Sequence, residues 1–130
     1  MRHQSLFKER QLVHEAHACV TEHFDGHDLS DYLNGAINDK EDIERVISQL
    51  SRLFLRLREL RAIHGDFKAK NLLVNASGIR LIDTDGMEFL VHRGRFSRKF
   101  RSDFKRLLAN WEKSSSVRLE LESQLRTIFE

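Results

Sequence analysis

Four polar residues near the middle of the chain have the types and spacing for chemistry on a phosphate group. Asp66, Lys68 and Asn71 follow one another closely, and Asp83 comes shortly afterwards. A carboxylate can accept a proton and a lysine ammonium can offset negative charge. An amide oxygen and a second carboxylate suit Mg²⁺, which is a hard cation that keeps few protein ligands beside a phosphate.

Residues 63–87 predict the elements that must bring these side chains together. Two apolar runs rich in β-branched residues flank a short turn that ends in glycine: Leu72–Asn75, Ile79–Asp83 and the turn Asn75–Gly78. This pattern predicts a β-hairpin. Counting back from the turn places Asn71 opposite or next to Asp83, with Cβ atoms about 5 Å apart. Asp66 and Lys68 then lie in the loop that leads into the first strand.

The polar loop also carries a resemblance to a known family. His64–Asn71 reads HGDFKAKN and resembles the catalytic loop of the protein-kinase-like fold, in the H-G-D-x-K-x-x-N form of atypical kinases. Leu81–Asp85 reads LIDTD and resembles the metal-binding segment, which is often I-D-x-D in small-molecule kinases. The chain resembles most the lipopolysaccharide kinase family, which phosphorylates Kdo or heptose sugars of the lipid A–core. The resemblance covers roughly residues 16–110.

The resemblance implies a role for each polar residue, with ATP and Mg²⁺ as cofactors. Asp66 would accept or orient the proton of the attacking sugar hydroxyl, and Lys68 would offset charge on the phosphoryl group. Asn71 and Asp83 would hold the Mg²⁺ ion that carries the nucleotide phosphates. Asp85 would be either a second metal carboxylate or a solvated loop residue.

Helices are predicted before the loop. Asp39 is expected to cap a long helix that ends near Ala62 and leads directly into the polar loop. Its apolar residues form one stripe: Ile43, Val46, Ile47, Leu50, Leu53, Phe54, Leu57 and Leu60. A short helix is predicted over Asp28–Asn34, with Asp28 as its N-cap and Gly35 after its end.

A second amphipathic helix is predicted after the hairpin, over Ser97–Trp111, and Gly86–Gly94 before it is expected to be irregular. Asp103 falls at the margin of the apolar face. It resembles the residue that braces the catalytic loop in kinase-like folds, so we expect it to accept hydrogen bonds from backbone N–H groups near His64 and Gly65. His64 itself would brace the loop or pack as an ordinary buried histidine.

The predictions for the N-terminal part of the chain follow mainly from the resemblance to kinases. Residues 1–15 form a poorly defined segment, and Ala16–Thr21 is predicted as a strand that corresponds to the hinge strand of a kinase. Glu22 and Phe24 would then contact the nucleotide, with an ordinary core position as the alternative for Phe24. No glycine-rich loop and no strand lysine of the kind that covers the phosphates precedes this strand.

The predicted fold is therefore α+β and mostly α: a protein-kinase-like C-lobe, with helices around a catalytic-loop β-hairpin, a short N-terminal strand and no complete N-lobe. The C-lobe would span residues 16–112, and residues 113–130 would form a C-terminal helix with one apolar stripe. The implied enzyme is a kinase in a truncated or partial form, with an N-lobe in trans as one way to complete it. A homodimer is also possible, through the apolar surface that an N-lobe would cover. The alternative is a catalytically inactive remnant that serves as a binding module.

The composition of the chain indicates the cellular compartment in which it is expected. The 130 residues carry a net charge of +2, one cysteine and no proline. A single cysteine excludes an internal disulfide and favours a reducing compartment. No apolar run approaches the roughly 18 residues of a membrane span, and the N-terminus lacks the apolar core of a signal peptide. A cytoplasmic protein is expected.

A basic stretch follows the hairpin, with seven cationic residues within fourteen positions: Arg93, Arg95, Arg98, Lys99, Arg101, Lys105 and Arg106. Such a stretch either attracts an anionic partner or forms a solvated helix face. The resemblance favours an anionic glycolipid or sugar acceptor, and a peripheral position at the inner-membrane surface. Nucleic acid is not expected, on the premise that no aromatic residues interleave the basic ones as stacking platforms.

Overall fold

The computed structural model describes residues 26–35 and 39–130 of the chain. Helices hold most of these residues, and the strands form two small antiparallel sheets. The predicted α+β, mostly helical class is therefore confirmed. The predictions for residues 1–15, for the strand Ala16–Thr21 and for Glu22 and Phe24 fall outside the described residues.

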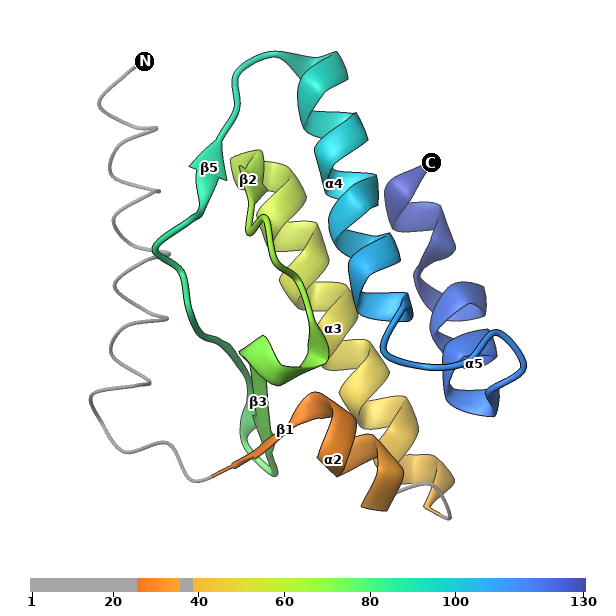
Figure 1. Ribbon diagram of the computed structural model, residues 1–130. Coiled ribbons are helices and arrows are strands. Elements are labelled where there is room, and N and C mark those ends of the chain that lie inside the picture. Colours follow the sequence, from red (N-terminus) through yellow and green to blue (C-terminus); the bar gives the residue numbers. More distant parts are fainter. Residues whose placement is uncertain (1–25, 36–38) are drawn as a thin grey trace.

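The long helix α3 (Lys40–Leu60) runs through the centre of the molecule (Figure 1). Its predicted cap is confirmed, because Asp39 Oδ1 accepts a hydrogen bond from the backbone N–H of Asp42 at 3.2 Å. The helix ends before Ala62, since Arg61 adopts a left-handed conformation (φ 52°) and closes the last turn. The predicted stripe faces the core, and its buried members are Val46, Ile47, Leu50, Phe54 and Leu57.

We expect Asp39→Ala to lower the free energy of unfolding by about 1 kcal/mol, because the N-terminal turn of α3 loses its side-chain acceptor. Urea denaturation followed by circular dichroism measures the change. Glu41→Ala is the matched control, since it removes an exposed carboxylate from the same turn and leaves the cap in place. Equal losses in the two variants would mean that charge at this helix end matters and the cap does not.

Two further helical segments pack beside α3. These are α4 (Arg93–Leu108) and α5 (Ser116–Leu125), and a short 3₁₀ turn, η2 (Arg126–Phe129), continues α5. The predicted start of α4 at Ser97 was wrong by four residues. His92 caps the earlier start, because its Nδ1 accepts from the backbone N–H of Arg95 at 3.2 Å. The helix also ends at Leu108, short of Trp111.

The predicted hairpin is confirmed as β3 (Leu72–Asn75) and β4 (Gly78–Leu81), with Leu72 opposite Leu81. The second strand was predicted to begin one residue too late and to end two residues too late, and the chain has a positive φ (55°) at Asp83. A two-residue strand, β1 (His27–Asp28), joins β3 as the third strand.

Helix α2 (Leu29–Gly35) follows β1 directly. The predicted N-cap is confirmed, since Asp28 Oδ1 accepts from the backbone N–H of Asp31 at 3.0 Å. The helix includes Gly35, which had been expected to follow its end. Its buried Leu29 and Leu33 face η1 and β3, so α2 closes the hairpin end of the core.

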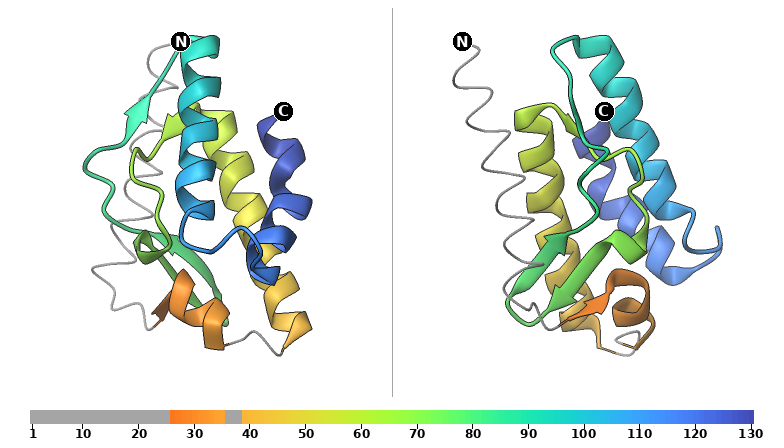
Figure 2. Two further views of the ribbon diagram at one scale, coloured as in Figure 1. Left: turned by 45° about the vertical axis from the view of Figure 1, so that its right-hand side comes forward. Right: turned by 60° about the vertical axis from the view of Figure 1, so that its left-hand side comes forward.

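The segment Gly86–Gly94 is not wholly irregular, contrary to the prediction. Strand β5 (Glu88–Phe89) pairs with β2 (Ala62–Ile63), the two residues that connect α3 to the polar loop. Figure 2 shows this pair at the end of α3 opposite to the hairpin and α2. Strands of two residues have no periodicity to detect, so only the tertiary structure defines them.

The polar loop therefore runs from one sheet to the other, between α3 and α4. Its own 3₁₀ turn, η1 (Ala69–Asn71), leads into β3. The loop residue Phe67 is fully buried, and its ring centroid lies 4.7 Å from that of Phe54 on α3. Of the helices in the described ranges, none is both long and apolar enough to cross a membrane.

Candidate functional site

The start of the polar loop is held by Asp103 of α4. Its Oδ2 accepts from the backbone N–H of His64 at 2.9 Å, and its Oδ1 accepts from that of Gly65 at 3.1 Å. Gly65 has φ 90°, a conformation that residues with a Cβ rarely adopt, and this turns its N–H toward α4. The expected backbone contacts of Asp103 are thus present, and they fix the loop to a rigid helix.

Burial dominates the electrostatics of Asp103, whose side chain is 4% exposed. The loss of water raises the pKa of this carboxyl above its ordinary value. The two backbone N–H groups act in the opposite direction and favour the ionised form. Burial outweighs these two donors, so the net effect on the pKa is upward.

His64 joins the loop to the hairpin. Its Nδ1 accepts from the backbone N–H of Asp66 at 3.2 Å, and its Nε2 lies 3.0 Å from the carbonyl oxygen of Ile82. A carbonyl can only accept, so Nε2 carries the proton and the ring is the neutral tautomer. The ring is buried and packs edge-on against Phe67. These contacts agree with a bracing part for His64.

Asn71 lies opposite Ile82 at the open end of the hairpin, which puts Asp83 next to it in register, as the counting of strand residues predicted. The backbone N–H of Ile82 donates to the carbonyl of Asn71 at 2.8 Å, so Asp83 is the next residue along. The Asn71 side chain donates from Nδ2 to the carbonyl of Asp66 at 2.9 Å. Any ligand of Asn71 would therefore use Oδ1, which is the type of atom that Mg²⁺ prefers.

The backbone of Asp83 is strained, since a positive φ is uncommon for residues with a Cβ. Aspartate tolerates this conformation better than most residues, at a cost of about 1–2 kcal/mol. The side chain is exposed. Backbone strain of this kind concentrates at functional sites, which is consistent with a functional role for the Asp83 carboxylate.

Asp66 is the exposed acidic group of the loop, with 46% of its side chain in contact with solvent. Lys68 Nζ lies 3.5 Å from its Oδ2, and Arg106 Nε lies 3.6 Å from its Oδ1. The structure thus brings the predicted pair Asp66 and Lys68 together and adds Arg106. Arg106 was not predicted as a site residue, although it lies one helical turn after Asp103 and therefore near the same side of α4.

The donor set fits a magnesium site that is completed by a ligand. Among residues 26–35 and 39–130, no group of three or more His, Cys, Asp or Glu side chains has the geometry of a metal site. Asn71 and Asp83 alone provide one amide oxygen and one carboxylate, with the exposed Asp85 two residues further on. Mg²⁺ usually binds one or two carboxylates, several waters and the phosphates of its substrate. A site of this composition requires no protein cage.

The basic stretch is spread around α4 and does not form a single face. Lys99 pairs with Glu88 at 3.1 Å, and Arg101 donates to the carbonyl of Phe129 at 3.0 Å. Aromatic residues do interleave the cations, contrary to the premise from the sequence, but they are all buried: Phe96, Phe100 and Phe104. They cannot act as stacking platforms for bases.

Comparison with known proteins adds no assignment. No family model matches the chain, and no curated protein matches it.

Proposed function

We propose that the chain carries the catalytic-loop half of a magnesium-dependent phosphotransferase. The proposed reaction is transfer of a phosphoryl group from ATP to a sugar hydroxyl, of the lipopolysaccharide kinase type, on a kinase-like C-lobe. The observation that carries this proposal is the fixation of one loop from two sides. Asp103 binds its backbone from α4, and His64 ties it to the hairpin, while the carboxylate of Asp66 stays exposed.

This arrangement suits proton transfer and charge stabilisation by the chain's own residues. The Asp66 carboxylate would accept the hydroxyl proton of the acceptor, and Lys68 would offset negative charge that develops on the transferred group. The His64–Asp66 hydrogen bond holds the Asp66 backbone, so the carboxylate keeps its position while the acceptor binds. Positioning of this kind supplies much of the catalysis in phosphoryl transfer.

Asn71 Oδ1 and the Asp83 carboxylate are the proposed ligands of Mg²⁺, with Asp85 as a further carboxylate nearby. When bound, the ion would neutralise phosphate charge. Lys105 and Arg106 are both exposed near the end of α4, and Arg106 reaches Asp66. An anionic glycolipid, or a sugar that carries an acidic group, is therefore the proposed acceptor.

A second candidate function follows from the ion pairs of Asp66. Two cations, Lys68 and Arg106, already lie beside its carboxylate. The two cations compensate part of the negative charge of Asp66, which weakens it as a proton acceptor. In the alternative, the loop binds a partner or ligand through these charges and catalyses no reaction, as a kinase-like remnant would.

A thermal-shift titration with ATP and Mg²⁺ separates the two candidates. Ligand at about ten times its Kd stabilises the folded state by about 1.4 kcal/mol, which corresponds to a few degrees in Tm for a chain of this size. We expect this rise with ATP and Mg²⁺ together, and its loss in Asp83→Asn. Asparagine also tolerates a positive φ, so the variant removes the charge and keeps the backbone.

The control variant is Glu112→Ala, which removes an exposed carboxylate from the segment after α4. Its response should equal that of the wild type. A second control adds ATP with a chelator in place of Mg²⁺, and no rise is expected. If millimolar nucleotide with Mg²⁺ leaves the Tm of the folded wild type unchanged, the phosphotransferase proposal is wrong and the binding module is favoured.

A further inference from the structure

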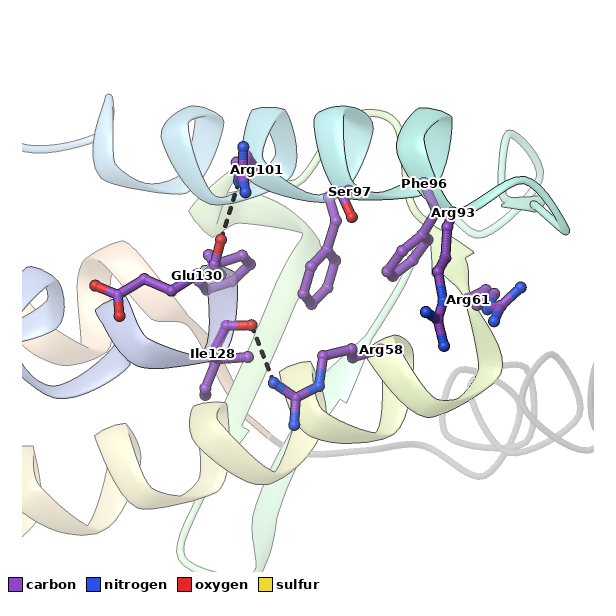
Figure 3. A pocket seen from close by; sticks show the side chains of 10 residues that line it. Arg58, Arg61, Arg93, Phe96, Ser97, Arg101, Ile128 and Glu130 are labelled. Carbon is purple, nitrogen blue, oxygen red and sulfur yellow. Dashed lines mark hydrogen bonds between the residues drawn. The ribbon is translucent and has the colours of Figure 1, made fainter.

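A cavity beside the N-terminal part of α4 is lined by four arginines. It has a volume of about 310 Å³ and lies between α3, α4 and η2 (Figure 3). Arg58 and Arg61 come from the end of α3, and Arg93 and Arg101 come from α4. Rings of buried phenylalanines, Phe96 and Phe129 among them, form the apolar part of the wall.

The cavity is separate from the proposed phosphotransfer site. Arg93 and Asp103 are ten residues apart on α4, which corresponds to about 15 Å along the helix axis. Asp103 binds the polar loop, whereas Arg101 donates to the carbonyl of Phe129 in η2. The two side chains therefore face different neighbours of α4.

A purely structural role explains only some of the arginines that line the cavity. Arg58 donates to the carbonyl of Ile128 at 3.2 Å, and Arg61 donates to that of Val91 at 2.6 Å. Each of these bonds uses one of the five N–H donors of a guanidinium. The side chain of Arg93 makes no hydrogen bond or ion pair with another residue of the described ranges. It adds positive charge to the cavity without fastening any described element.

The charge balance indicates an anionic ligand. Four of the lining residues are arginines and one is acidic, Glu130, whose carboxylate lies 3.9 Å from Arg126 outside the lining. In Figure 3, Arg61 and Arg93 lie at one end of the cavity, Arg101 lies near the C-terminal turn, and Arg58 lies between them. Like charges that share a cavity repel one another, and an anion between them removes this repulsion.

We propose that this cavity binds a phosphate group carried on a small, partly apolar body. The planar guanidinium fork matches two phosphate oxygens at once, which a lysine ammonium does not do. The volume lies at the lower end of the range for ligand pockets, about 300–1,000 Å³, so it admits one phosphate and a small body. The phenylalanine wall favours an apolar or aromatic body.

Phenyl phosphate is a suitable probe, because it combines a phosphate with one aromatic ring. The test titrates the full ¹⁵N-labelled chain and follows the backbone amides of the lining residues by NMR, at about 150 mM salt to screen diffuse attraction. We expect saturable shifts with phenyl phosphate and none with phenol at the same concentration. Absence of saturable shifts with phenyl phosphate overturns the proposal.

Two arginines of α4 provide a matched pair of variants. Arg93→Gln removes a lining guanidinium and should weaken phenyl phosphate about tenfold, the effect of one charge-assisted contact. Arg98→Gln removes the same charge from an exposed, non-lining position of the same helix and should leave the affinity unchanged. Arg93→Lys keeps the charge without the fork and should lie between Arg93→Gln and the wild type. Equal weakening in Arg93→Gln and Arg98→Gln means general attraction to a basic surface and overturns the proposal.

Vesicle sedimentation then distinguishes the source of the phosphate. Phosphatidylglycerol vesicles that bind the wild type and Arg98→Gln, but bind Arg93→Gln about tenfold less, identify a lipid headgroup as the ligand. Failure to bind these vesicles, together with the NMR result for phenyl phosphate, identifies a soluble phosphate ester. Phosphatidylcholine vesicles are the control without net charge.

Discussion

We expect Asp103→Asn to lower the free energy of unfolding by about 2–3 kcal/mol, although the two side chains have nearly the same shape. The carboxylate accepts from two backbone N–H groups, those of His64 and Gly65. An asparagine can accept with one oxygen only, and its NH₂ group would face the second N–H donor. A buried donor without an acceptor, close to another donor, is the source of the loss.

Chemical denaturation of wild type and variant measures this difference, and Asp85→Asn serves as the control. Asp85 is exposed, so the same substitution there should change stability by no more than about 0.5 kcal/mol. Similar small changes at both positions would contradict the bracing part assigned to Asp103.

The pH dependence of the same pair of proteins follows from the raised pKa of Asp103. The carboxyl group of Asp103 binds its proton more tightly in the folded protein than in the unfolded chain, where its pKa is about 3.9. The stabilisation from proton binding is fully present below that value and is lost as pH rises through the raised pKa. Wild type should therefore lose stability relative to Asp103→Asn over this interval. A difference between the two proteins that is constant from about pH 4 upward would contradict the raised pKa.

Phe54→Ala is expected to lower the free energy of unfolding by about 3–5 kcal/mol, the largest effect predicted for this protein. Phe54 is fully buried on α3, and its ring centroid lies 4.7 Å from that of Phe67 and 4.9 Å from that of Phe129. Two rings of α4, those of Phe100 and Phe104, meet it edge-on at 6.0 Å. One side chain thus joins α3 to the polar loop, to α4 and to η2.

The loss is measurable only if the variant still folds, because the whole stability of a small domain is about 5–15 kcal/mol. Phe54→Leu keeps most of the side-chain volume and should lower the free energy of unfolding by about 1–2 kcal/mol. This variant measures the contribution of the position even if the alanine variant does not fold. The control is Leu55→Ala, the neighbouring position on α3, which is 41% exposed and should change stability by about 0.5 kcal/mol at most. If Phe54→Ala and Leu55→Ala lost the same stability, Phe54 would not be the centre of the core.

Local interactions determined what could be predicted from the sequence by itself. The apolar stripe of α3 repeats within a single helix. The caps Asp28 and Asp39 each accept from a backbone N–H group three residues further along the chain. The turn of the hairpin likewise sets its register, and the register places Asn71 beside Asp83. The placement of Asp103 on the apolar margin of its helix predicted only that its side chain can point inward, and the resemblance to kinase-like folds supplied the expected backbone partners.

The tertiary structure alone decided the contacts that join distant segments. The β2–β5 pair, the Arg106–Asp66 ion pair and the Arg58–Ile128 hydrogen bond connect residues about 25 to 70 positions apart. Strands of two residues carry no period, and a long arginine on an exposed helix face has many partners within reach. The arginine cavity is of the same kind, because it requires the end of α3, the start of α4 and η2 to meet. Such a meeting depends on the packing of the whole core, for which no single stretch of sequence carries a signal.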